Sequence, residues 1–163
     1  MSQLTKAQLK VYAAEDEVLS RFPASPVARL IFSRFDDPAL ACEAYILHVL
    51  NQPWFKDHFS APGPLQVKAW KGYANGSGCQ PDSSMRKGSI IRIDRKQCAN
   101  PRAMEKVCLH ELAHHLTTKK DDTRMHGHHH AWRVNYVFLV RQMIGWRAAR
   151  YLSRYFKPFD RFQ

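Results

Sequence analysis

The sequence contains no C-x-x-C pair, no apolar run that approaches the roughly 18 to 20 residues needed to cross a bilayer, and few acidic residues. Its four cysteines are too widely spaced for a zinc ribbon or a thioredoxin-type motif, so we expect reduced thiols in a cytoplasmic protein, with two disulfides as the alternative. Residues 1–10 have no apolar stretch after their charges, so we expect neither a secretory signal nor membrane insertion. The cysteines are Cys42, Cys79, Cys98 and Cys108.

The charge balance is strongly basic, with 25 Lys and Arg against 14 Asp and Glu and a formal net charge of +11. The hydrophobic content of 45% excludes disorder as the default, and 163 residues fit a single domain spanning residues 1–163. From Arg133 onward the chain has seven basic residues and one acid. This charge indicates an anionic partner, most commonly nucleic acid, although many basic proteins bind nothing specific.

Hydrophobic periodicity predicts an α+β fold. Alternating apolar residues indicate half-buried strands at 65–70 and 89–93, joined by a long glycine-rich hairpin loop over 71–88. A short apolar stretch flanked by turn residues predicts another strand at 28–33. Helical spacing and capping residues predict helices at 5–21, 37–50, 101–117, 128–144 and 146–156.

Seven of the nine histidines lie between residues 110 and 130, and the first of them open an H-E-x-x-H motif at residues 110–114. On a helix, His110 and His114 lie about 40° apart, so both imidazoles can reach one Zn²⁺ ion. Glu111 points to the side of that pair, where a general base is needed. The alternative is an ordinary helix. Because the other faces are apolar, however, burying these polar groups unpaired would cost several kcal/mol.

A catalytic zinc needs a third protein ligand. A glutamate on a following helix is excluded, because the only acids after Glu111 are aspartates. The longer H-E-x-x-H-x-x-G-x-x-H pattern fails too, since Thr117 and Lys120 occupy its glycine and last histidine positions. Asp121 is a weak candidate, and His115 faces away from the pair. The remaining candidates are His126, His128, His129 and His130.

With these motifs the chain resembles the SprT-like zincin metallopeptidases, in which H-E-x-x-H is followed, after a loop, by His-Gly-Pro-x-aromatic at the start of the next helix. Within that group it looks closest to a small family of actinobacterial metallohydrolases. The resemblance covers nearly the whole chain. It rests on Val11-Tyr12-Ala13-Ala14-Glu15, Gln52-Pro53-Trp54, residues 109–115, Tyr136, Leu139-Val140 and Gly145.

The resemblance departs from the family pattern at the third ligand. His126 is followed by the expected glycine, but His130 then stands at the aromatic position. Taking His128 instead places Trp132 there and aligns Tyr136 and the Leu-Val pair with their family counterparts. The resemblance therefore implies His128 as the third ligand, with His126 as the alternative.

The resemblance implies a small zincin-like domain, in which a short, mostly antiparallel sheet packs on the central H-E-x-x-H helix. It also implies a zinc-dependent metallopeptidase that acts on a peptide or protein substrate, with Zn²⁺ held by His110, His114 and His128 and with Glu111 as the catalytic base. An extended substrate would pair with the edge strand near the zinc. The rival hypothesis is a nucleic-acid-binding protein with a structural zinc. The oxyanion donor is expected among Tyr73, His129 and His130.

A basic stripe is predicted on the last helix, where Arg147, Arg150 and Arg154 share one face. SprT-like relatives are associated with proteolysis on DNA, so the resemblance implies DNA-associated proteins as substrates. In this chain any DNA contact would come from the domain itself, through this helix. The alternative for the stripe is a solvated helix face that only complements the apolar side.

Overall fold

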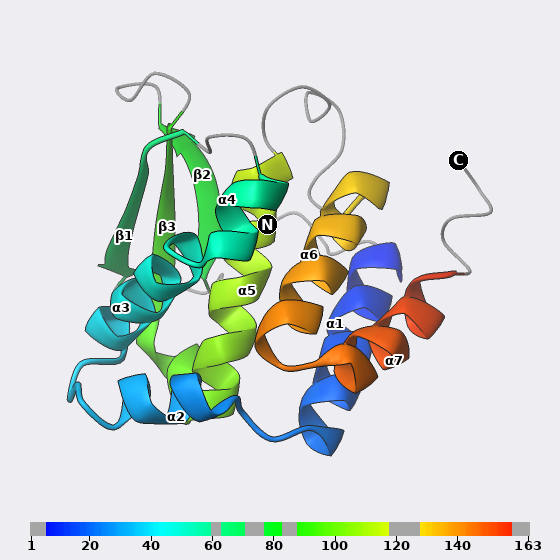
Figure 1. Cartoon of the computed structure of the whole chain (residues 1–163), viewed down its shortest axis with the longest axis horizontal. Helices are drawn as coiled ribbons and strands as arrows, with labels where there is room; N and C mark the ends of the chain where they lie inside the picture. Colours follow the sequence, from blue (N-terminus) through cyan, green and yellow to red (C-terminus); the bar gives the residue numbers. More distant parts are fainter. Residues whose placement is uncertain (1–5, 60–62, 71–76, 83–87, 118–127, 158–163) are drawn as a thin grey trace.

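The computed structural model describes residues 6–59, 63–70, 77–82, 88–117 and 128–157. These ranges contain seven α-helices, three β-strands and one short 3-10 helix at Arg95–Cys98 (Figure 1). The helices are α1 (Lys6–Arg21), α2 (Pro26–Phe32), α3 (Pro38–Leu50), α4 (Pro53–His58), α5 (Pro101–Thr117), α6 (His130–Met143) and α7 (Trp146–Phe156). The strands are β1 (Leu65–Trp70), β2 (Gly78–Asp82) and β3 (Gly88–Asp94). The fold is therefore α+β, and mostly helical.

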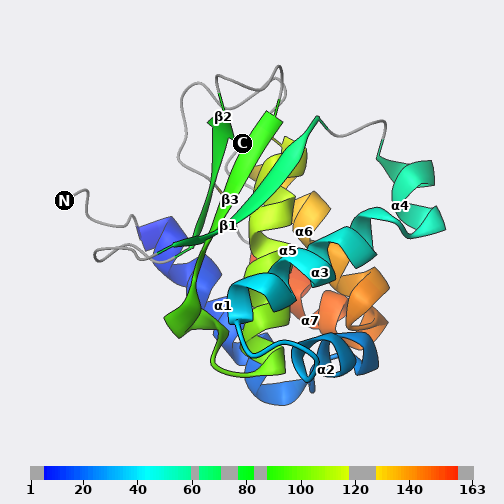
Figure 2. The same cartoon turned by 90° about the vertical axis from the view of Figure 1, so that its left-hand side faces the viewer.

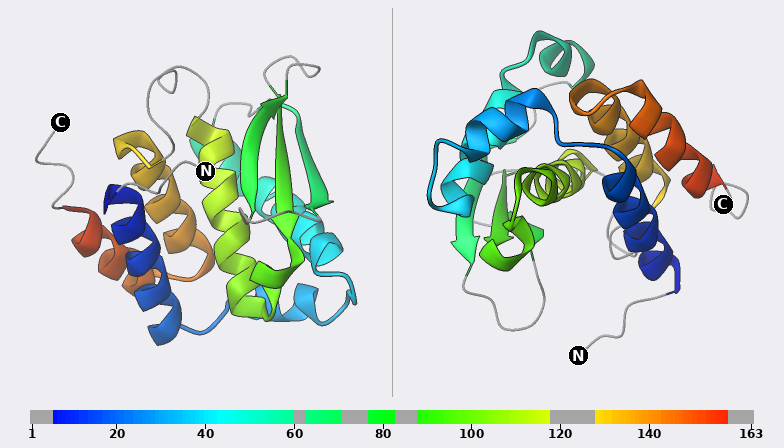
Figure 3. Two further views of the ribbon diagram at one scale, coloured as in Figure 1. Left: turned by 180° about the vertical axis from the view of Figure 1, so that it is seen from behind. Right: turned by 90° about the horizontal axis from the view of Figure 1, so that it is seen from below.

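Helix α5 lies at the centre of the molecule. The sheet and α3 lie on one side of it, and α6, α1 and α7 lie on the other (Figures 1 and 3). The helix starts where the Asn100 side chain accepts a hydrogen bond from the Ala103 N–H at 2.9 Å, with Pro101 as its first residue. Met104, Leu109 and Leu112 are fully buried, because α5 is covered on nearly every face. The H-E-x-x-H motif thus sits inside the core.

The sheet differs from its predicted form. Its order is β1-β3-β2, with β1 parallel to β3 and β2 antiparallel to β3 (Figure 2). The expectation of a mostly antiparallel sheet was wrong for β1. Residues 78–82, which we assigned to a hairpin loop, form the antiparallel partner of β3 and leave β1 on the opposite edge. Alternation of apolar residues predicts that a strand exists, but not which strand it pairs with or in which direction.

The strand predicted at 28–33 is also wrong, since these residues lie mostly in α2. The Ser25 side chain caps this helix by accepting from the Ala28 N–H at 3.1 Å, and Pro26 occupies its first position. Helix α4 was not predicted. Pro53 indicates the end of the preceding helix, but it is also the first residue of α4. The other five helices were predicted within two residues. Residues 71–76 and 83–87 of the predicted loop lie outside the described ranges.

The four cysteines are free thiols, as expected. Cys42 and Cys98 are buried with their sulfur atoms 3.6 Å apart, and Cys108 donates to the Cys42 carbonyl. None of the helices in the described part of the chain has the length and hydrophobicity that crossing a bilayer requires.

The buried carboxylate of Glu105 joins three helices. Glu105 of α5 accepts hydrogen bonds from the Ser25 N–H at 2.8 Å, from the Ser25 hydroxyl at 2.5 Å and from the Tyr45 hydroxyl at 2.6 Å. Burial raises the pKa of Glu105, while the hydrogen bonds from Ser25 and Tyr45 oppose that rise. Through these contacts Glu105 fastens the start of α2 and the middle of α3 to α5.

Replacing Glu105 by alanine is expected to lower the free energy of unfolding by about 2 to 4 kcal/mol, because three buried donors lose their acceptor. Urea denaturation measures the change. The control is Glu43→Ala, which removes an exposed carboxylate from α3 and should change stability by no more than about 0.5 kcal/mol. A loss at Glu105 as small as that of the control would show that the buried hydrogen bonds contribute little.

Candidate metal centre

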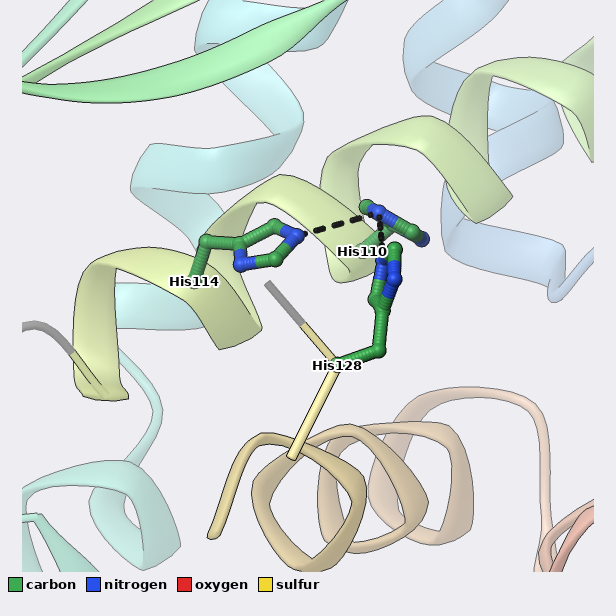
Figure 4. Close-up of side chains that lie close together, drawn as sticks. All are labelled: His110, His114 and His128. Atoms are coloured by element: carbon green, nitrogen blue, oxygen red, sulfur yellow. Dashed lines mark hydrogen bonds between the residues drawn. The ribbon is translucent and has the colours of Figure 1, made fainter. Parts of the chain in front are cut away.

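Three histidine side chains converge beside α5. His110 and His114 lie one turn apart on α5, and His128 lies just before α6 (Figure 4). The Nε2 atom of His110 is 3.2 Å from Nε2 of His114 and 3.1 Å from Nε2 of His128. One ring nitrogen from each histidine lies within 4.8 Å of the other two. The structure therefore brings together the three histidines predicted as ligands, and this cluster could hold a metal ion.

Two of the three separations between the nitrogens fit binding to a single ion. Two nitrogens bound at 2.0 to 2.1 Å to a tetrahedral ion lie about 3.3 Å apart. The observed separations of 3.1 and 3.2 Å are close to this value.

Glu15 of α1 fixes the orientation of His110. Its Oε1 atom lies 2.6 Å from His110 Nδ1, and both side chains are buried. A proton shared at Nδ1 leaves Nε2 with its lone pair directed at the other two histidines, which is the form that a metal ligand requires. The hydroxyl of Tyr136 on α6 also hydrogen-bonds Glu15. Helices α1, α5 and α6 are thus joined through this one carboxylate.

The environment favours neutral imidazoles at two of the three positions. Burial and the neighbouring His110 and His128 lower the pKa of His114 well below its ordinary value. Burial and His110 likewise lower the pKa of His128 to about 3. Burial also acts to lower the pKa of His110, but the Glu15 and Glu111 carboxylates outweigh it and raise the pKa. Their negative charge would equally stabilise a bound cation.

Glu111 is buried on the sheet side of the centre. Burial and the nearby Glu15 raise its pKa to about 7, while His110 and a hydrogen bond from the backbone N–H of Cys79 oppose the rise. Its Oε2 atom has no hydrogen-bond partner among the described residues. A carboxylate with a pKa near neutrality and a free buried oxygen is suited to accept a proton. Because Cys79 lies in β2, the sheet edge contacts the site directly.

Aromatic rings surround the histidines. Trp132 is fully buried, lies within 5.2 Å of all three imidazole rings between centroids, and donates its N–H to the His110 carbonyl at 3.4 Å. Tyr12 of α1 is half-buried and stacks on His110, with ring centroids 5.7 Å apart. Burial, with Glu15 and Glu111 nearby, raises the pKa of Tyr12 to about 12, so its hydroxyl stays protonated at neutral pH. Arg133 supports His128 by donating to its carbonyl at 2.9 Å.

The remaining predicted site residues fall into two groups. His115 is buried on another side of α5, as expected, and His129 and His130 flank the start of α6. The alternative ligand His126 and the oxyanion candidate Tyr73 lie outside the described ranges. Sequence reasoning assigned no role to Glu15 or Tyr12, although both lie in the Val11–Glu15 segment that supports the family resemblance.

Comparisons of the chain with protein-family models, with curated proteins and with solved structures find no match. What the three histidines and Glu111 do is therefore inferred from their own geometry and chemistry.

Proposed function

We propose that this chain is a zinc-dependent metallopeptidase with a zincin-like domain, in which His110, His114 and His128 bind the metal and Glu111 is the general base. The observation that carries the proposal is the pairing of three convergent Nε2 atoms with a buried carboxylate whose pKa lies near neutrality. Three imidazole ligands suit Zn²⁺ among the common metal ions, and three protein ligands leave a coordination position for water or substrate.

A zinc ion at this site would supply Lewis acidity, lowering the pKa of a water molecule and polarising the substrate carbonyl. Glu111 accepts the proton of the attacking water on its free buried oxygen. Glu15 holds the His110 ring in one orientation, and Arg133 holds the backbone of His128. Trp132 closes the inner side of the centre and keeps water out there.

The sheet offers a place for an extended substrate. Its two edges are β1 and β2, and β2 contacts the candidate base through the backbone of Cys79. We therefore assign β2 as the strand beside which a peptide would lie, with its main chain paired to the strand and its scissile carbonyl at the histidines. Pairing through the main chain does not depend on the sequence of the peptide, so the proposed substrate class is a peptide or protein. Side-chain contacts would then set any sequence preference.

Purified protein supplemented with zinc is expected to retain about one equivalent of the metal and to lose it when His114 is replaced by alanine. Metal analysis after gel filtration measures both values. The same samples test peptidase activity on an unstructured protein, with a chelator as the negative control. Less than about half an equivalent in the wild type would contradict the site. A zinc with four protein ligands and no activity would favour the rival function, a nucleic-acid-binding protein with a structural metal.

The basic stripe on α7 supports a second proposal, that the domain binds DNA and acts on DNA-associated proteins. Arg147, Arg150 and Arg154 are all exposed, while Ala148 and Leu152 of the same helix are buried. The three arginines therefore lie on the exposed face of α7, as predicted, although Tyr155 of the predicted apolar face is exposed as well. A row of exposed arginines on one face can contact successive phosphates of a nucleic acid.

If these arginines contact phosphates, replacing all three by glutamine should flatten the slope of log K against log salt by about 2 to 3. Each neutralised phosphate releases counterions, so each lost contact removes about 0.9 from the slope. Fluorescence anisotropy with a labelled duplex measures the slope. The control, Arg29→Gln with Arg34→Gln, removes exposed charge from α2 and the turn after it and should leave the slope nearly unchanged. Equal slopes for wild type and the triple variant would identify the stripe as a solvated face.

A further inference from the structure

Tyr12 occupies a distinct position beside the three histidines. Its ring is nearly parallel to the His110 ring, with 5.7 Å between centroids and 12° between planes. It meets the His128 ring edge-on at 5.4 Å. Tyr12 therefore contacts two of the three candidate ligands from α1, a helix that contributes no ligand of its own.

The Tyr12 hydroxyl is available for a ligand, unlike the polar groups of the other two aromatic residues at the centre. Trp132 donates to the His110 carbonyl, and Tyr136 hydrogen-bonds Glu15. Both of these side chains are buried, whereas Tyr12 is half-buried, so part of its side chain is accessible to solvent. Within the described ranges, the Tyr12 hydroxyl makes no hydrogen bond.

Hydrolysis of a carbonyl compound passes through a tetrahedral anion, and a donor that faces its negatively charged oxygen lowers the barrier. Such a donor must be protonated, held in place before the reaction and located beside the reacting carbon. A phenol, with an ordinary pKa of about 10, meets the first condition. The contact of the Tyr12 ring with the His110 ring meets the second. Its contacts with both His110 and His128 place it beside the position where a carbonyl would bind.

We propose that Tyr12 is a catalytic residue whose hydroxyl donates a hydrogen bond to the anionic oxygen of the tetrahedral species formed at the three-histidine site. The proton stays on the phenol, so no further acid or base is needed. This assignment rests on the proposed metal-dependent hydrolysis and adds the donor that it requires. It adds Tyr12 to the candidates Tyr73, His129 and His130 that are expected from the sequence.

The test uses Tyr12→Phe, which keeps the ring on His110 and removes only the hydroxyl. The protein is loaded with cobalt(II), whose visible spectrum reports both metal binding and anion binding at the metal. Inorganic phosphate serves as the tetrahedral anionic probe. We expect Tyr12→Phe to bind cobalt as tightly as the wild type but to bind phosphate about tenfold more weakly or worse, because a hydrogen bond to a charged oxygen is lost.

Two control variants separate this role from packing. Tyr155→Phe changes an exposed tyrosine on α7 and should leave both affinities unchanged. Tyr136→Phe removes a hydrogen bond to Glu15 and should weaken cobalt binding itself. Unchanged phosphate affinity in Tyr12→Phe, or a loss of cobalt affinity in that variant, would overturn the proposal. The titration needs no peptidase activity, so an inactive protein that loses phosphate affinity in Tyr12→Phe would refute the proposed function but confirm that this hydroxyl contacts an anion at the site. A wild type that binds no cobalt would refute both.

Discussion

Replacing Glu111 by glutamine is expected to lower the rate of peptide hydrolysis by about 10²- to 10⁴-fold while leaving the metal bound. Glutamine has nearly the same size as glutamate, and its amide oxygen can still accept the hydrogen bond from the Cys79 N–H. It cannot accept a proton from the attacking water at neutral pH. The expected loss is therefore in kcat, with zinc content unchanged, and both quantities are measured on the same preparation.

The matched control is Glu43→Gln, which makes the same chemical change at an exposed position on α3. It should leave both kcat and zinc content unchanged. A Glu111→Gln variant that hydrolyses peptide at the wild-type rate would reject Glu111 as the base. A variant that loses zinc as well would show instead that Glu111 helps to bind the metal. Metal analysis distinguishes these two outcomes, because zinc is retained in the first and lost in the second.

Local sequence signals predicted five of the seven helices in the described ranges. Helices α1, α3, α5 and α7 begin and end within one residue of the predicted limits, because prolines, capping side chains and apolar periodicity act over only a few residues. The sheet was predicted less well, since strand order and direction depend on contacts between distant segments. Strand β2 begins with glycine, has proline as its fourth residue and shows no alternating apolar pattern, so nothing in its residues indicated a strand.

The same distinction applies to the metal centre. His110 and His114 were predictable because a helix places residues four apart on one face. His128 was selected through the family resemblance, and the structure brings its Nε2 within 3.1 Å of His110. Glu15 was not predictable from spacing, since 95 residues separate it from the histidine that it contacts. Glu15 lies one turn after Tyr12 on a helix that also has charged residues on its outer face. In the sequence it therefore cannot be distinguished from an acidic residue at the surface.

Glu15→Gln is expected to weaken zinc binding by about 10- to 100-fold, which is the usual effect of losing a carboxylate that orients a histidine ligand. The carboxylate holds Nδ1 of His110 protonated and adds negative charge next to the cation. Glutamine can still accept one hydrogen bond but carries no charge, and its amide group can rotate to present a donor instead. Competition with a chromogenic zinc chelator measures the affinity.

Glu17→Gln is the matched control for this substitution, because Glu17 lies two residues further along α1 and pairs with Arg21 at the surface. It removes the same charge from the same helix, but Glu17 does not contact His110. If the contact of Glu15 with His110 matters more than the total charge of α1, zinc affinity should stay within about twofold of wild type. An equal loss in both variants would mean that helix charge, and not the hydrogen bond, sets the affinity. Wild-type affinity in Glu15→Gln would show that Trp132 and Tyr12 suffice to orient the ring. A loss confined to Glu15→Gln would establish that α1 belongs to the metal centre.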